Sequence, residues 1–242
     1  MPVHIPILFY HRILPDSEMS GPMPLTAPLS LFQDQMNWLK RRGYSTLTPA
    51  EFFEALQSGR CPKAKVCMIT FDDGTDDHLR HALPVCLEHG FRPLVFAIAG
   101  MLGQQYSAHF PARLMSATDL REWIKQGGYV GCHSMSHPDL SKCPEKELHR
   151  EILESKSLLE QETGEEIQTF CYPSGKYSDA TLRLVEKAGY QCAFTTLKGN
   201  VHTFKDRFVL RRVKVGRGTS PTRLAYRTSR LYHWIHGRQV ER

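Results

Sequence analysis

Residues 66–74, with the sequence VCMITFDDG, decide the fold class of this chain. The run from Val66 to Phe71 is short, apolar and rich in residues that favour buried strands. It passes through two aspartates and a glycine into a helix-like pattern that begins at Asp76. A buried strand that leads through polar residues into a helix is typical of a βα unit in a parallel sheet.

The same unit recurs along the chain. Short apolar runs predict strands at 5–10, 66–71, 94–99, 129–132, 167–172, 192–196 and 208–213. Apolar residues at helical spacing predict helices at 30–42, 49–57, 76–89, 119–126, 144–163 and 179–188. We expect Thr118 to cap the helix at 119–126 and Pro84 to kink or shorten the helix at 76–89. No linker-like stretch divides the units, so the pattern predicts one α/β domain, a distorted (β/α)7-type barrel of parallel strands.

Composition excludes several classes of protein. The chain has 242 residues, of which 41% are hydrophobic and 23% charged, so a disordered or collagen-like chain is excluded. The formal net charge is +6, but residues 205–242 carry eleven basic and only two acidic side chains. The basic excess therefore belongs to the C-terminus, and the remainder of the chain is slightly acidic. We expect a principal domain at 1–218 and a basic helical tail at 219–242.

Cysteine usage and the N-terminus bear on the compartment. Seven cysteines are scattered without a C-x-x-C pair, which argues against a disulfide framework and against a structural zinc site. The first residues lack the basic and apolar regions of a signal peptide, and no segment reaches the ~20 apolar residues that span a bilayer. These features predict a cytoplasmic protein, although a secreted protein without its signal peptide would have the same appearance.

Polar residues follow several of the predicted strands. His11 follows the first strand, Asp72 and Asp73 the second, His133 the fourth, and residues 173–175 (Pro-Ser-Gly) the fifth. In parallel α/β barrels the carboxyl ends of the strands carry the active site, because the βα loops converge there. The sequence therefore predicts one site at this end of the barrel.

Within that group, His133 and His137 have a spacing that allows two imidazoles to bind one metal ion. Each signal is weak alone, because the histidines could be ordinary loop residues and the two aspartates could cap the following helix. Together they supply two neutral nitrogens and a carboxylate, the composition of a catalytic zinc site with a position open for water. One aspartate would bind the metal, while the other would accept a proton from the activated water.

Three motifs connect these residues to a known family. They are TFDDG at 70–74, HSMSHP at 133–138 and FCYPSGKY at 170–177. In this order they resemble the motifs of the polysaccharide deacetylases, carbohydrate esterase family 4, which carry the NodB homology domain. The likeness runs from the Tyr-His-Arg of residues 10–12 to about Val215 and covers most of the chain. It implies a NodB-like barrel and a hydrolase that releases acetate from an N-acetylated amino sugar.

The resemblance also implies roles for individual residues. Asp73, His133 and His137 would bind one divalent metal ion, with Zn2+ expected and Ni2+, Co2+ or Mn2+ as alternatives. Asp72 would be the general base that activates the water. The backbone N–H of Ser174 would hold the developing oxyanion. This donor would belong to a substrate-binding turn that also contains Tyr172, Pro173 and Gly175.

Two departures from the family pattern concern catalytic groups. Many members carry an arginine two residues before the proline of the third motif, where it orients the catalytic aspartate, and Cys171 stands at that place here. Arg212 is the candidate substitute, with an ordinary surface arginine as the alternative. The usual late Leu-x-His motif, which supplies a general acid, is absent after Thr196. His11 resembles the Tyr-His of the poly-N-acetylglucosamine deacetylase branch and is the candidate acid, with a structural role as the alternative.

The predicted substrate is an N-acetylated sugar of a polysaccharide, a lipopolysaccharide or a lipid-linked glycan. The alternatives are a different amide or a formamido sugar on the same fold and metal, or a carbohydrate-binding protein without catalysis. No nucleic-acid recognition motif accompanies the basic residues, so no nucleic acid is expected as a partner. Arg223, Arg227 and Arg230 share a helical face among aromatic residues, which predicts either peripheral membrane contact or packing of the tail on the barrel.

Overall fold

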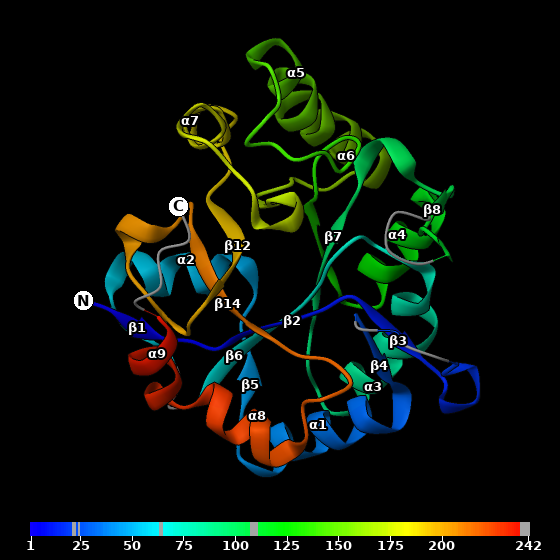
Figure 1. Cartoon of the computed structure of the whole chain (residues 1–242), viewed down its shortest axis with the longest axis vertical. Helices are drawn as coiled ribbons and strands as arrows, with labels where there is room; N and C mark the ends of the chain where they lie inside the picture. Colours follow the sequence, from blue (N-terminus) through cyan, green and yellow to red (C-terminus); the bar gives the residue numbers. More distant parts are fainter. Residues whose placement is uncertain (21–22, 24, 63–64, 107–110, 238–242) are drawn as a thin grey trace.

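A ring of parallel strands lies at the centre of the computed structural model, which describes residues 1–20, 23, 25–62, 65–106 and 111–237. The strands follow the order β2, β14, β12, β11, β10, β7 and β6, and pairing of β6 with β2 closes the ring (Figure 1). Their bounds are β2 Ile7–Tyr10, β6 Val66–Phe71, β7 Leu94–Ala97, β10 Tyr129–Cys132, β11 Thr169–Cys171, β12 Cys192–Lys198 and β14 Leu210–Lys214. The predicted barrel of seven parallel strands is confirmed.

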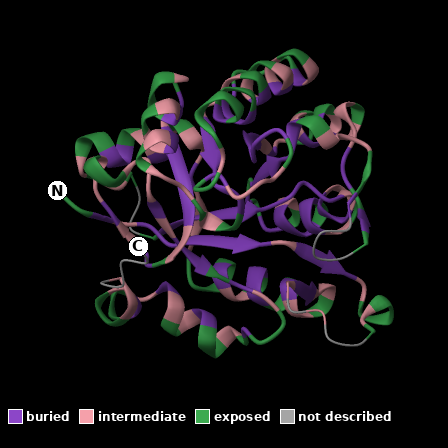
Figure 2. Ribbon diagram, turned by 45° about the horizontal axis from the view of Figure 1, so that its top comes forward, coloured by how far each residue is buried: buried purple, intermediate pink, exposed green. Residues whose placement is uncertain are grey.

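Helices surround this ring and carry exposed residues on their outer sides, as the green and pink parts of the ribbon in Figure 2 show. They are α1 Leu29–Arg41, α2 Pro49–Ser58, α3 Leu83–Glu88, α4 Ala117–Lys125, α5 Glu145–His149, α6 Ser155–Thr163, α7 Asp179–Lys187, α8 Pro221–Thr228 and α9 Arg230–His236, with π-helical segments at η2 His78–Ala82 and η4 Arg150–Glu154. None of the helices in the described ranges is long and apolar enough to cross a membrane.

Short strands and 3-10 turns lie at the two ends of the barrel. Strand β5 (Ser45–Thr46) pairs in parallel with the first two residues of β6. The remaining pairs are β1 (Val3–His4) with β13 (Val201–His202), β3 (Arg12–Leu14) with β4 (Thr26–Pro28), and β8 (Gln105–Tyr106) with β9 (Ala112–Arg113). Single 3-10 turns occur at η1 Asp16–Glu18, η3 Ala99–Met101, η5 Pro173–Gly175 and η6 Phe204–Asp206.

The strands are continuous apolar runs because both of their faces are covered. Every residue of β6 is buried, for example. One apolar core lies between the ring and the helices and includes Trp123 and Leu148, while a second core fills the interior of the ring. Phe52 of α2 belongs to the second core together with Val3 and Val66, so α2 closes the amino end of the barrel. The carboxyl ends of the strands remain for the polar site.

Helix α4 begins earlier than the sequence predicts. Its cap is Ser116 rather than the expected Thr118, because the Ser116 side chain accepts a hydrogen bond from the backbone N–H of Asp119. The Asp119 carboxylate accepts in return from the Ser116 N–H at 2.8 Å, which completes a capping box. The reciprocal pair satisfies two backbone donors, whereas Thr118 lies inside the first turn.

Pro84 has the disruptive effect that the sequence predicts, and the structure shows how it is accommodated. The helix before it widens to π geometry, and the N–H of Leu83 donates to the carbonyl of His78, five residues earlier. A proline cannot donate and its ring crowds the carbonyl four residues before it, so a wider turn relieves both problems. The expected helix at 76–89 therefore consists of η2 followed by α3.

Candidate metal centre

The polar residues at the carboxyl ends of the strands come together. Strands β6, β7, β10 and β11 are consecutive neighbours in the ring, so the loops that follow them meet at one end. Oδ1 of Asp73, after β6, lies 3.6 Å from Nε2 of His133, after β10. The same oxygen lies 3.4 Å from Nε2 of His137. One ligand atom from each of these three side chains lies within 4.8 Å of the others, a spacing suited to a single metal ion.

The backbone around this group is unusual. Among the described residues, only four residues other than glycine have positive φ angles, and all four stand in the predicted motifs: Asp73 (72°), Ser134 (67°), His137 (62°) and Ser174 (53°). Such conformations cost of order 1–3 kcal/mol each and persist where the surroundings impose them. One interaction that holds this backbone in place is a hydrogen bond from the backbone N–H of His137 to the side-chain oxygen of Ser134, at 2.9 Å. Strain is thus concentrated where the side chains are brought together.

Glu151 of η4 fixes the loop that carries His137. Its carboxylate accepts the backbone N–H groups of Met135 at 3.0 Å and Ser136 at 2.9 Å, and the Ser136 hydroxyl at 2.7 Å. The Glu151 side chain is buried, although it is charged. The sequence motifs do not include it, but one signal was available. Glu151 lies three residues after the buried Leu148, on the inward face of its helix, where an ionised group needs polar partners.

Hydrogen bonds of the two imidazoles leave one nitrogen of each ring directed at Asp73. Nδ1 of His133 donates to the carbonyl oxygen of Cys171 at 2.7 Å, which leaves the lone pair on Nε2. Nδ1 of His137 lies 3.3 Å from the hydroxyl of Tyr106, a second partner outside the sequence motifs. Burial lowers the pKa of His133 to about 4, so the ring is neutral at pH 7. Neutral imidazoles oriented by hydrogen bonds at Nδ1 are typical of metal ligands.

Asp73 has the properties expected of a carboxyl group that can bind a cation. Its side chain is 1% exposed, and Oδ2 has no hydrogen-bond partner among the described residues. Burial, and next the charge of Asp72, raise the pKa of Asp73 to about 8. A cation bound here would satisfy the buried oxygen and favour the ionised form. Two imidazole nitrogens and one carboxylate also match the ligand set of catalytic zinc sites, so the residues present fit a divalent metal ion.

Asp72 faces a different partner. Nη1 of Arg212 donates to Oδ1 of Asp72 at 2.7 Å, and Nη2 donates to Oδ2 at 2.7 Å. Both side chains are buried, and the guanidinium lies 4.2 Å from the ring centre of Phe9. Burial alone would raise the pKa of Asp72, but the Arg212 charge and hydrogen bonds outweigh it and hold that pKa well below its usual range. The structure therefore places Arg212 inside the barrel against Asp72, and not on the surface.

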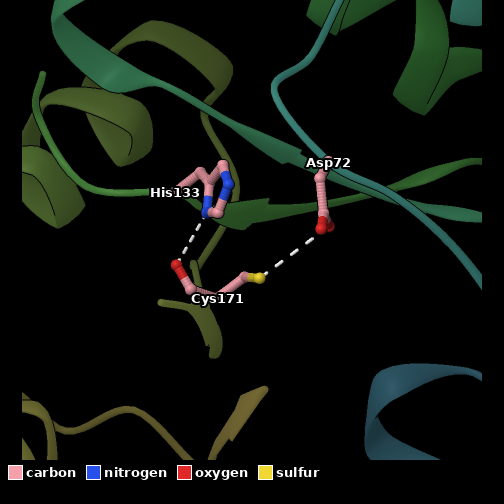
Figure 3. A group of neighbouring side chains, drawn as sticks. All are labelled: Asp72, His133 and Cys171. Carbon is pink, nitrogen blue, oxygen red and sulfur yellow. Dashed lines mark hydrogen bonds between the residues drawn. The ribbon is translucent and has the colours of Figure 1, made fainter. Parts of the chain in front are cut away.

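Cys171 lies beside the same pair. Figure 3 shows it between Asp72 and His133. Its Sγ atom is 3.8 Å from Oδ1 of Asp72 and 3.2 Å from Nη2 of Arg212. Burial raises the pKa of Cys171 well above its usual value, so the group is a thiol. Although Asp72, His133 and Cys171 carry potential ligand atoms within 4.8 Å of one another, the Arg212 guanidinium is already the cation of this group.

The 172–175 turn follows β11 at the same end. Ser174 is exposed with a φ of 53°, whereas the ring of Tyr172 is buried and its hydroxyl donates to the carbonyl of Phe208 at 3.0 Å. The Tyr172 side chain and the buried Pro173 therefore support the turn from below. Gly175 has a φ of 70°, and a Cβ atom there would lie 2.2 Å from Oγ1 of Thr196. Only glycine fits at this point, and the fit brings Ser174 to the surface.

His11 lies half-buried after β2, close enough to Asp72, Arg212 and Lys214 for their charges to act on it. Its backbone carbonyl accepts a hydrogen bond from Nε2 of His78. Burial is the largest cause that lowers the pKa of His11, to about 4. The imidazole is therefore neutral at pH 7 before substrate binds. A role in proton transfer must begin from this neutral form.

Comparison with known proteins gives consistent matches. The family model for polysaccharide deacetylases matches residues 59–193. YxkH of Bacillus subtilis is 31% identical over 219 residues, which cover 90% of this chain and 74% of YxkH. The poly-beta-1,6-N-acetyl-D-glucosamine N-deacetylase of Staphylococcus aureus is 26% identical over 175 residues, which cover 69% of this chain and 59% of that protein. The structure of the Streptococcus pyogenes deacetylase PplD in complex with acetate matches with a TM-score of 0.84 at 28% identity, over 95% of this chain and 100% of that chain.

The matched region includes the residues from which the site is built. Residues 59–193 span the paired aspartates, the two histidines that face Asp73 and the 172–175 turn, and the barrel itself matches a solved deacetylase over nearly its full length. Motifs, fold and overall similarity agree, and the chain belongs to the polysaccharide deacetylase family.

Proposed function

We propose that this chain hydrolyses the amide bond of an N-acetylated sugar in a glycan and depends on one divalent metal ion. The observation that carries the proposal is the division of labour between two adjacent carboxylates. Asp73 is buried against two imidazoles, and one of its oxygens has no hydrogen-bond partner in the described part of the chain, while Asp72 is ionised and held by Arg212. Membership of the polysaccharide deacetylase family supports the reaction class.

Asp73, His133 and His137 would hold the metal ion. When bound, such an ion supplies a Lewis acid for the amide carbonyl and lowers the pKa of water towards neutrality. Zn2+ is the expected ion, because nitrogen and carboxylate ligands of this number are typical of catalytic zinc. Ni2+, Co2+ and Mn2+ are the alternatives that metal replacement would compare.

Asp72 would act as the general base. Its low pKa keeps it ionised throughout the neutral range, so it is always able to accept a proton from the attacking water. Arg212 would act as a positioning residue, because its two parallel hydrogen bonds fix the plane of the Asp72 carboxylate. In this chain Arg212 would replace the arginine whose place Cys171 takes.

The 172–175 turn would hold the acetyl group. The backbone N–H of Ser174, on an exposed turn, would donate to the carbonyl oxygen as negative charge develops on it. Such a donor is worth about 2.7–4 kcal/mol in comparable sites. Tyr172, Pro173 and Gly175 would fix the position of this donor rather than bind the sugar through their side chains.

His11 would pass the proton to the leaving amine. The nitrogen of a collapsing tetrahedral intermediate becomes an amine with a pKa of about 8, comparable to an α-amino group. That nitrogen is more basic than either Asp72 or His11. The proton that Asp72 takes from water would pass to the imidazole of His11 and then to the nitrogen, and the last transfer is favourable. The C–N bond then breaks, and acetate and the free amino sugar are released.

The substrate class and the domain limits complete the proposal. The Staphylococcus aureus relative is named for poly-beta-1,6-N-acetyl-D-glucosamine, so polymers of N-acetylglucosamine are the first substrates to test, ahead of lipopolysaccharide and lipid-linked sugars. We assign catalysis to residues 1–218, which contain the whole family match. Residues 219–242 form the basic tail, of which 238–242 lie outside the described residues.

The test measures acetate released by the metal-loaded protein from N-acetylglucosamine oligomers, lipopolysaccharide and lipid-linked sugars. Asp72→Asn should retain the metal but lose roughly 100- to 10,000-fold in rate, as expected for removal of a general base. Asp76→Asn changes an aspartate four residues later that is paired with Arg80, and this matched control should keep the parental rate. Release at the parental rate by Asp72→Asn would refute the proposed base, and no release from any substrate would refute the activity.

A further inference from the structure

Helices α8 and α9 extend the chain beyond the barrel and are buried on one side only. Leu224 and Thr228 of α8 are buried, and α8 packs on α1. In α9, Tyr232 is 5% exposed and belongs to the apolar core that lies between the ring and the helices. The inner sides of both helices are therefore accounted for by packing on the body of the protein.

The outer side of this pair is apolar. Within the described residues, the exposed large hydrophobic side chains are Met1 at the chain start and four residues of α8 and α9, namely Tyr226, Leu231, Trp234 and Ile235. Leu231, Trp234 and Ile235 are spaced three and four residues apart and share one face of α9. Leu231 is 53% exposed and Ile235 47%. Such a cluster is unusual on a surface that faces only water.

Basic residues predominate in and around the two helices. No acidic residue occurs between Asp206 and Glu241 in the sequence. A hollow of about 260 Å3 lies between the two helices and the end of β12. Its lining contains three cations and no carboxylate: Lys198, Arg223 and Arg227, together with Tyr226, Tyr232 and His236. The surface thus combines apolar side chains with a basic hollow of a size that admits a phosphate group.

We propose that α8 and α9 dock this protein on an anionic phospholipid bilayer. The apolar face of α9 would enter the boundary between headgroups and acyl chains, as in amphipathic surface helices. Lys198, Arg223 and Arg227 would contact lipid phosphates. Charge complementarity selects this occupant, because an uncharged apolar partner would leave the cations without counter-charges and a soluble anion would leave Leu231 and Ile235 in water.

Hydrogen bonds join the docking surface to the barrel through the segment that follows β12 and through the end of β14. The side-chain amide of Asn200 donates to the carbonyls of Arg227 at 3.0 Å and Ser229 at 2.8 Å, where α8 meets α9. The Asn200 carbonyl accepts the N–H of Ile5 at 3.0 Å, just before β2 begins. Figure 1 shows α9 beside β1, away from β8 on the metal side.

The experiment is sedimentation of the full chain with vesicles of phosphatidylcholine alone and of phosphatidylcholine mixed with phosphatidylglycerol. We expect binding to the anionic vesicles only, weakened by salt. Leu231→Ser/Ile235→Ser should abolish sedimentation, and Arg223→Gln should weaken it about fivefold, the effect of one basic residue near an anionic surface. Arg183→Gln removes an exposed charge from α7 and is the matched control, which should bind as the parent does.

Several results would overturn the proposal. The proposal is wrong if both kinds of vesicle sediment the protein equally, or if Leu231→Ser/Ile235→Ser binds vesicles as the parent does. It is also wrong if inorganic phosphate competes with vesicle binding to the same extent in the parent and in the variant with the apolar substitutions. A dimer in solution that the same double substitution dissociates would assign the face to a second copy of the chain. Acetate release from a soluble oligomer is measured in parallel and should be unchanged in all variants. If the parent releases no acetate, the deacetylase function is refuted, but the vesicle result still stands.

Discussion

Arg212→Gln removes the buried cation that holds the Asp72 carboxylate. In the parent, two hydrogen bonds of 2.7 Å join the side chains, and neither is accessible to solvent. The variant leaves an ionised carboxylate in the barrel next to Asp73, without a counter-charge. Removal of one partner of a buried ion pair costs about 3–5 kcal/mol in free energy of unfolding. We expect a loss in this range at neutral pH.

The loss of stability in Arg212→Gln should depend on pH, and the direction of this dependence follows from the titration of Asp72. In the parent, Arg212 keeps the pKa of Asp72 below its unfolded value, so the pair stabilises the fold above that value and less as pH falls. In the variant, burial without the guanidinium raises the pKa of Asp72, so the carboxyl takes up a proton and part of the penalty disappears in acid. The difference between parent and variant should therefore be largest near pH 8 and shrink towards pH 4.

Urea unfolding of the metal-free protein, followed by circular dichroism across this pH range, measures the effect. Arg80→Gln is the control, because the Arg80–Asp76 pair has a similar length of 2.8 Å but an exposed arginine. It should lose at most about 1 kcal/mol. Asp72→Asn/Arg212→Gln removes both charges and should recover much of the stability. A loss below about 1 kcal/mol for Arg212→Gln, equal at pH 4 and pH 8, would refute the reasoning.

Three further predictions concern the metal and the proton path. His137→Ala should reduce the metal content by elemental analysis from about one ion to near zero, whereas His81→Ala should not; equal content in both would remove His137 from the ligand set. Zinc binding to the metal-free protein at pH 7 should release about one proton, because burial holds the pKa of Asp73 near 8, and release should vanish above pH 9. Calorimetry in buffers of different ionisation enthalpy measures this release, and identical heats in all buffers at pH 7 would contradict it. His11→Ala should slow hydrolysis of the N-acetyl amide roughly 100-fold or more but spare an aryl acetate ester, whose leaving group needs no proton. Equal losses on the two substrates would assign His11 a structural role.

The local sequence determined most of the secondary structure. Apolar runs of strand length and their alternation with helical spacing were enough to place the barrel strands and the turns that end them, because those signals repeat within a few residues. The sequence predicts the start of a helix less precisely where two neighbouring residues can each cap it. Ser116 and Thr118 are both good caps, and the partner at Asp119 selects Ser116.

The position of His133 and of the two aspartates also followed from sequence, because residues at the carboxyl ends of parallel strands must converge. The resemblance to the deacetylases then separated the expected ligand, Asp73, from the expected base, Asp72. The geometry supplies the physical basis of that separation, since one carboxylate faces two imidazoles and the other faces a guanidinium.

Tertiary structure alone decided the contacts that act across the barrel. Arg212 meets Asp72 at a separation of 140 residues only because β14 and β6 both flank β2 in the closed ring. Glu151 reaches the loop before His137 only through the packing of η4. The sequence determined which residues stand at the ends of the strands, because that pattern is local. Ring closure decided which charges face one another and how burial shifts their pKa values, because these depend on atoms distant in the chain.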